Sequence, residues 1–217
     1  MIQKNRLTAD YLRSLPDEDV RAALSKLTTK QLEELKFDYS FLARDNQLPP
    51  SGDWNVWFLN CGRGFGKTWT GVQWVRDQVK KGHKRIAAVA STNSDIERVM
   101  VKGESGFLSL CSKHDKTNKG KPLGFPEWSP TKRTLTWENG AKVEFYSAEE
   151  PERLRGPQFS AAWCDELAAW NKDQETWDML QFCLRLGRHP RVCVTTTPKS
   201  TVLVRSLLKD PKAHITT

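Results

Sequence analysis

The chain has 217 residues, which is enough for one α/β domain with a sizeable core and a small appendage. Its 34 Lys and Arg outnumber its 26 Asp and Glu, giving a formal net charge of +8. A basic balance of this size favours an acidic partner, such as nucleic acid or a membrane surface. No apolar run is long enough to span a bilayer and no signal peptide opens the chain, so we expect a soluble cytoplasmic protein and exclude a membrane-embedded one.

The cysteines indicate a reducing compartment rather than a metal site. They are Cys61, Cys111, Cys164, Cys183 and Cys193. They form no CxxC pair and no Cys/His ligand spacing, which argues against zinc. Their odd number and wide scatter argue against a disulfide framework.

Residues 1–40 predict short helices. Residues 16–27 begin with a proline and acids suited to a helix N-terminus and continue with apolar residues at helical spacing. Residues 28–45 repeat the pattern, with Thr28 or Thr29 as the N-cap. These helices form either a cover on the main domain or a docking arm for a partner protein.

A Pro/Gly-rich stretch at 47–53 punctuates the chain. We therefore expect two parts, an N-terminal helical segment over 1–46 and a larger domain over 47–217.

Beyond residue 53 the pattern changes to strands alternating with helices. Strands are expected at 54–60, 85–91, 159–166 and 191–198, and helices at 68–81, 94–103 and 174–187. Residues 134–147 alternate around Asn139-Gly140, a strong hairpin signal. Residues 210–217 look like a further strand. The fold class is therefore α/β, with a wound, mostly parallel sheet flanked by helices and an antiparallel hairpin addition.

The stretch "FLNCGRGFGKTWTG" at 58–71 lies between an expected strand and an expected helix. In that context a Gly-rich loop ending in Gly-Lys-Thr predicts a phosphate-binding loop, because backbone N–H groups at a helix N-terminus attract anions. Lys67 would reach the β- and γ-phosphates, and the Thr68 hydroxyl would bind Mg²⁺. Cys61 stands where the pattern has its first glycine, so Gly62 would have to supply the turn.

Two adjacent acids, Asp165 and Glu166, end the expected strand at 159–166. Beside a phosphate loop, Asp165 would bind the magnesium shell and Glu166 would polarise the attacking water as general base. The other possibility is that both carboxylates only cap the following segment. The next strand ends in three threonines whose hydroxyls could sense the γ-phosphate: Thr195, Thr196 and Thr197.

Arginines offer candidates for stabilising the transferred phosphoryl group. Arg63 lies inside the phosphate loop, where its backbone already approaches the phosphates. Arg153 and Arg155 lie on a Pro-bounded loop before the acidic strand, and either could be an ordinary solvated residue. The basic segment 111–133, with one Trp among its lysines, fits a loop that follows a nucleic-acid backbone about as well as a solvated, mobile loop.

Taken together, these motifs resemble the ATPase domain of tailed-phage large terminases, the motors that package DNA into procapsids. The resemblance runs from about residue 41 to residue 217. It depends on the order of the motifs "QLPPSGDW", "GRGFGKT", "VMVKGESG", "NGAKVEFYSAEEPERLRGPQ", "WCDELAAW" and "TTTPKS". It implies a RecA/ASCE-like P-loop NTPase fold.

The resemblance also implies site roles. Gln47 would contact adenine, Arg63 would lie near the γ-phosphate, and the three threonines would form the coupling motif. Arg155 would be the trans-acting arginine finger, with Arg153 as the fallback. The nucleotide-binding set would be Gln47, Gly62, Arg63, Gly64, Gly66, Lys67, Thr68 and Trp69.

By the same resemblance, the cofactors are ATP and Mg²⁺, and the partners are double-stranded DNA, the portal protein of the procapsid and the small terminase subunit. The chain would assemble into a homo-oligomeric, pentameric ring or stay monomeric in isolation. It would act in the host cytoplasm, transiently on the procapsid and outside the mature virion. Such terminases carry a nuclease after this domain, and we expect no nuclease activity in these 217 residues.

Three alternatives remain open from the sequence. A helicase-like or remodelling ATPase would share the loop and the acid pair but would normally need a second RecA-like domain. A regulatory module could bind nucleotide without turnover. A purely nucleic-acid-binding protein would account for the charge alone.

Overall fold

The computed structural model describes residues 8–217, which fall into two compact units divided between Leu48 and Pro49. The first unit contains short helices α1 (Ala9–Arg13), α2 (Asp17–Ser25), α3 (Thr29–Leu35) and α4 (Tyr39–Leu42), and the 3-10 turn η1 (Asp45–Gln47). Part of the helical prediction for 1–40 falls on residues 1–7, outside the described residues.

The predicted helical stretch 28–45 is divided into three pieces. Thr28 caps α3, as predicted, and forms a capping box with Gln31. Asp38 then caps α4, because its side chain accepts a hydrogen bond from the Phe41 N–H. An aspartate that binds the backbone ahead of it favours a new helix start over a continuous helix.

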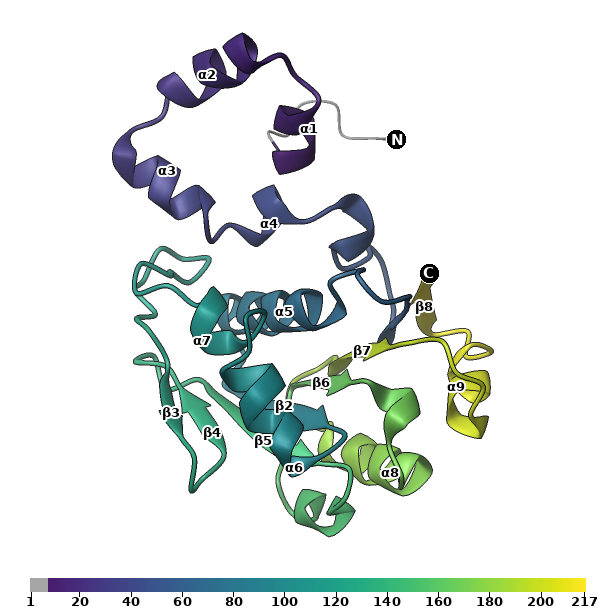
Figure 1. Cartoon of the computed structure of the whole chain (residues 1–217). Coiled ribbons are helices and arrows are strands. Elements are labelled where there is room, and N and C mark those ends of the chain that lie inside the picture. The colour runs from purple at the N-terminus through teal and green to yellow at the C-terminus, as the bar shows by residue number, and fades with distance from the viewer. Residues whose placement is uncertain (1–7) are drawn as a thin grey trace. The chain divides into compact units, whose positions relative to one another are not determined.

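The second unit is built on one sheet (Figure 1). Its strands are β1 (Val56–Asn60), β2 (Arg85–Ala90), β3 (Glu127–Ser129), β4 (Thr134–Thr136), β5 (Lys142–Ser147), β6 (Ala161–Asp165), β7 (Arg191–Thr196) and β8 (Ala213–Thr216). Their order is β3-β4-β5-β2-β6-β7-β1-β8. The strands from β5 to β8 in this order pair in parallel, and β3 and β4 are antiparallel additions.

Helices and turns connect these strands. They are α5 (Lys67–Lys81), α6 (Asn93–Asp95), η2 (Ile96–Val101), α7 (Phe107–Leu110), η3 (Pro151–Leu154), η4 (Leu167–Ala169), α8 (Asp173–Cys183) and α9 (Val202–Leu207). Figure 1 shows α5 on one face of the sheet and α8 on the other. In the described chain, none of the helices is long and apolar enough to cross a bilayer.

Burial on both faces explains why the central strands are continuous apolar runs. Along β1, Trp57 and Leu59 pack into the core on the α5 face, whereas Val56 and Phe58 pack into the core on the α8 face. Alternate side chains of a strand point to opposite faces, so a strand covered on both sides needs apolar residues throughout. The predicted α/β class with a mostly parallel sheet is confirmed.

The structure refines several predicted elements. The hairpin around Asn139-Gly140 is present as β4 and β5, and β3 adds a third antiparallel strand that the sequence did not predict. The helix expected at 94–103 is a short α6 followed by the π-helix η2. Its wider turn is seen in the Lys102 N–H, which donates to the Glu97 carbonyl at 2.9 Å. The helix expected at 174–187 ends at Cys183.

Candidate active site

The loop between β1 and α5 folds as a phosphate loop. Its backbone enters the left-handed region at Gly64 (φ +80°) and Gly66 (φ +87°), where side chains other than glycine are strained. Gly66 directly precedes Lys67, the first residue of α5. Gly62 contributes its carbonyl, which accepts a hydrogen bond from Lys67 Nζ at 3.2 Å. The loop thus leads directly into a helix N-terminus, the geometry that binds anions.

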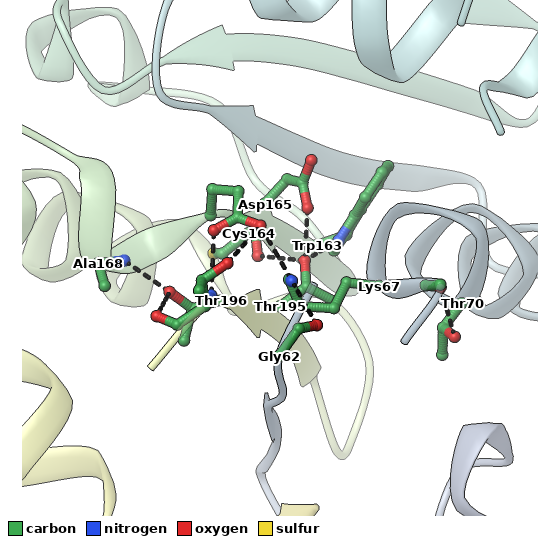
Figure 2. Close-up of polar contacts among 12 residues, drawn as sticks. Gly62, Lys67, Thr70, Trp163, Cys164, Asp165, Ala168, Thr195 and Thr196 are labelled. Carbon is green, nitrogen blue, oxygen red and sulfur yellow. Dashed lines mark hydrogen bonds and ion pairs between the residues drawn. The ribbon is translucent and has the colours of Figure 1, made fainter. Parts of the chain in front are cut away.

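The acid pair lies at the carboxyl end of β6, with β7 between it and the strand of the phosphate loop. Glu166 adopts a left-handed backbone (φ +47°), an unusual conformation for a residue other than glycine. This turn places Glu166 Oε1 3.4 Å from Lys67 Nζ. The structure therefore brings together the predicted lysine and the predicted general base, and Figure 2 shows Lys67 close to Asp165 and Thr195.

All three predicted threonines bind the acidic segment. Thr195 Oγ1 lies 2.7 Å from Asp165 Oδ1. Thr196 Oγ1 accepts from the Ala168 N–H at 3.0 Å. The Thr197 N–H donates to Glu166 Oε2 at 3.0 Å. Figure 2 shows Thr195 beside Asp165 and Thr196 beside Ala168.

Burial governs the electrostatics of Asp165. It raises the pKa of this carboxyl to about 7, outweighing Thr195 and Lys67, which lower it. A buried carboxylate of this kind is stabilised by a nearby cation. The donor chemistry fits Mg²⁺, because Asp165 offers a carboxylate and Thr68, in the first turn of α5, offers a hydroxyl. Mg²⁺ is usually held by one or two carboxylates together with substrate phosphates.

A cleft of about 710 Å³ opens over the phosphate loop. Its lining includes predicted residues from three motifs: Arg63, Gly64, Gly66, Lys67, Thr68, Trp69, Glu166 and Thr197. It also includes residues to which the sequence assigned no role, from η2 and the loop after it: Arg98, Val99, Gly103, Glu104 and Ser105.

The glycines of the loop after η2 are a sequence pattern that indicates a tight turn. An added Cβ at Gly103 would lie 2.5 Å from the Val99 carbonyl oxygen, and one at Gly106 would lie 2.7 Å from that of Val101. Both glycines are therefore required for the loop to fold back on η2. A Gly-x-x-Gly pair after a short helix indicates such a turn, but it does not say which wall the turn builds.

Two predicted arginines lie elsewhere. Arg153, in η3, and Arg155, directly after it, have exposed side chains and are not among the described residues that line the cleft. Arg155 Nε pairs with Glu152 at 2.7 Å. Gln47 belongs to the first unit, where its Oε1 accepts from the Arg44 N–H at 3.2 Å. Its contact with adenine stays a prediction.

Comparisons with known proteins show the family and the fold of this chain. The family model described as terminase large subunit, T4likevirus-type, N-terminal, matches residues 58–211. The large terminase ATPase domain of Thermus phage P74-26 is similar with a TM-score of 0.60 at 14% identity, over 87% of this chain and 84% of that one. The large terminase of a thermophilic bacteriophage, solved in complex with ADP, is similar with a TM-score of 0.55 at 14% identity, over 88% of this chain.

The present chain covers 45% of that ADP-bound terminase, so it corresponds to a part of it. At these identities the solved structures establish the shared fold, and the family model, which spans more than half of the chain, establishes the family. The chain belongs to the terminase large subunit family and contains its N-terminal domain.

Proposed function

We propose that this domain hydrolyses Mg-ATP in the cleft over the phosphate loop, and that the reaction drives double-stranded DNA into a phage procapsid. The observation that carries the proposal is the ion pair between Lys67 Nζ and Glu166 Oε1, which lie 3.4 Å apart. Asp165, the last residue of β6, directly precedes Glu166. A passive nucleotide binder needs the lysine but has no need for a carboxylate placed to activate water.

Each residue has a role in the proposed reaction. Backbone N–H groups of the loop and Lys67 hold the β- and γ-phosphates. Thr68 and Asp165 would hold Mg²⁺, which would neutralise charge on the phosphates. A triphosphate carries more negative charge than one carboxylate, so it draws the Lys67 ammonium away from Glu166. Glu166 is then free to accept a proton from the attacking water.

Further residues act around this centre. Arg63 approaches the γ-phosphate from within the loop, and Trp69 adds a further contact to the nucleotide. Thr195, Thr196 and Thr197 report the loss of the γ-phosphate, because their hydrogen bonds end on Asp165, on the segment after it and on Glu166.

The DNA-facing surface that we propose is the basic segment 111–133, which is anchored rather than loose. Asp115 accepts two hydrogen bonds from Arg76 of α5, at 2.8 and 2.6 Å, and both side chains are buried. The Leu123 N–H donates to the Asp115 carbonyl at 2.8 Å. These contacts hold the turn around Gly120 against the end of α5.

This anchored turn borders a basic cleft of about 660 Å³. The lysines that line it are Lys80, Lys81, Lys84, Lys119 and Lys121, with Glu138 as the acidic residue among the lining. Lysines converging on one groove suit the phosphate backbone of nucleic acid, which is bound by charge and without base readout.

The motor assignment extends to partners. We propose assembly into a ring on the portal protein, delivery of DNA by the small subunit and action in the host cytoplasm, and we assign no nuclease activity to this chain. A helicase-like ATPase is the alternative. Stimulation of turnover by portal-bearing procapsids with DNA would support the motor, whereas stimulation linked to strand separation would support the helicase.

The central test is steady-state phosphate release. Lys67→Ala and Glu166→Gln should each lower turnover by at least about a hundredfold, because each removes a group that acts on the transferring phosphoryl or on its water. Lys209→Ala, a change at an exposed lysine after α9, is the matched control and should turn over like the wild type. Wild-type turnover in either site variant would overturn the assignment.

A further inference from the structure

Trp163 is a fully buried residue of β6, two positions before Asp165. Its indole projects from β6 and contacts both α5 and β7. Figure 2 shows the indole beside Thr195 of β7. Sequence reasoning treated it as one apolar residue of a buried strand. Its contacts give it a more specific position.

Its contact with the phosphate-loop helix is very close. A Cβ added to Gly71 would lie 2.1 Å from Cε2 and 2.2 Å from Nε1 of the Trp163 ring. Gly71 follows Lys67 by four residues, so the two lie on the same face of α5. A glycine inside a helix is less favourable than an alanine. Here it is required by the approach of the indole, which fixes α5 against β6.

Its polar contact sets the direction of a hydrogen-bond chain. The indole N–H donates to Thr195 Oγ1 at 2.9 Å. An indole can only donate and a hydroxyl carries one proton, so Thr195 must send its proton elsewhere. The available acceptors are Asp165 Oδ1 at 2.7 Å and the Cys164 carbonyl at 3.2 Å. The Asp165 oxygen is the nearer of the two, which makes it the better-placed acceptor.

A third contact of the Trp163 ring is with α7, which follows the loop on the η2 side of the cleft. Phe107 packs on Trp163 edge to face, with ring centroids 6.1 Å apart. Phe107 begins α7 and follows the loop that contributes Gly103, Glu104 and Ser105 to the cleft. This indole of β6 therefore contacts three other elements around the site, namely α5, β7 and α7.

We infer that Trp163 is a positioning residue, which fixes the Thr195 hydroxyl on Asp165 and holds the phosphate-loop helix in register with the acid pair. The inference rests on the proposed function for its consequence in turnover. The hydrogen-bond chain itself can be measured without turnover.

The test uses Trp163→Phe, which keeps an aromatic ring but loses the N–H, and Thr195→Val, which removes the hydroxyl at nearly equal volume. We expect each to lower kcat by about tenfold, the equivalent of one buried hydrogen bond, with a change in KM of less than about threefold. The double variant should be no worse than Thr195→Val alone, because both changes break one chain. Thr195→Ser, which keeps a hydroxyl, should restore most of the turnover.

Two readouts are independent of turnover. Nitrogen-15 NMR of the indoles should show the Trp163 N–H signal shifting, and exchanging faster with solvent, in Thr195→Val. Calorimetry should show that Mg²⁺ strengthens ADP binding less in Trp163→Phe than in the wild type, with ADP affinity in the absence of Mg²⁺ unchanged within about threefold.

Trp137→Phe is the matched control. Trp137 is buried in the same apolar cluster and also packs edge-on against Phe107, with centroids 6.3 Å apart. It should lose stability but keep kcat and the Mg²⁺ effect. The inference would be overturned if the two reductions in kcat multiplied in the double variant, or if the Trp163 indole signal were unchanged in Thr195→Val. A wild type without turnover, but with the expected NMR shift, would overturn the proposed function and leave the positioning chain supported.

Discussion

At the scale of single residues, burial decides how much a charge pair contributes. Arg155 and Glu152 approach to 2.7 Å, but their side chains are 66% and 58% exposed, and such a pair is worth little in water. Arg76 and Asp115 approach to 2.6 Å with side chains 3% and 6% exposed. Removing one partner of a buried pair leaves the other charge buried and unpaired, which destabilises the fold by about 3–5 kcal/mol.

Asp115 therefore carries a pH-dependent share of the stability. Burial raises its pKa, but Arg76 and Lys80 lower it by more, so that the pKa lies below its ordinary value. A carboxyl whose pKa is lower in the folded than in the unfolded protein stabilises the fold at pH values above its unfolded pKa. This stabilisation is lost as the pH falls through the folded pKa. Asp115→Asn should therefore lower the free energy of unfolding at pH 7. The difference in unfolding free energy between Asp115→Asn and the wild type should stay constant down to about pH 5 and become smaller below about pH 4.

Urea denaturation across this pH range measures the effect. Glu152→Gln, which breaks the exposed pair, is the control and should change stability by less than about 1 kcal/mol. An equal loss in the two variants at pH 7 would contradict the role assigned to burial.

At the scale of elements, the anchored turn after Asp115 and the end of α5 form one basic surface. Lys119→Glu together with Lys121→Glu should weaken DNA binding and reduce its dependence on salt. Each lost phosphate contact lowers the slope of log affinity against log salt by about 0.9. Fluorescence anisotropy with a labelled duplex at several salt concentrations checks this.

The matched control is Lys209→Glu with Lys212→Glu, two exposed lysines before β8, at the other edge of the sheet. An equal drop in salt slope for both double variants would show that overall charge, rather than this surface, binds DNA. Turnover in the absence of DNA should stay unchanged in both.

The elements also show what the sequence could and could not predict. The phosphate loop, the acid pair and the Asn139-Gly140 hairpin were predictable because each depends on adjacent residues. The position of β7 between β1 and β6 was not, because strand order depends on contacts far apart in the chain. The cleft wall from η2 was missed for the same reason. Trp163 reads as an ordinary strand residue until Gly71 and Thr195 are placed beside it.

At the scale of the whole molecule, the proposed ring would allow one subunit to act on the nucleotide of another. Arg155 is exposed and lies outside the lining of its own cleft among the described residues, so its predicted action would have to be on a neighbour. If it acts in trans, Arg155→Ala should leave ATP affinity nearly unchanged, since the arginine matters when charge builds on the γ-phosphoryl group. Turnover under assembling conditions should fall by about a thousandfold or more.

Mixing inactive subunits gives the sharper measurement. Arg155→Ala combined with Lys67→Ala should recover activity, because some interfaces then join an intact phosphate loop to an intact finger. Lys67→Ala combined with Glu166→Ala is the control and should recover none, since both defects lie in the same site. Full activity of Arg155→Ala alone, or no recovery in verified mixed rings, would move the role to Arg153 or Arg63.

The helix α5 connects the cleft over the phosphate loop with the basic cleft proposed to bind DNA. It begins at Lys67 and ends at Lys81, beside the basic cleft, and its 15 residues span about 22 Å. It contains no proline at which to kink, and its one internal glycine is packed against Trp163. If both ends bind their ligands, thermodynamic linkage applies between them. The factor by which nucleotide changes the affinity for DNA must equal the factor by which DNA changes the affinity for nucleotide, and titrations in both orders would show it.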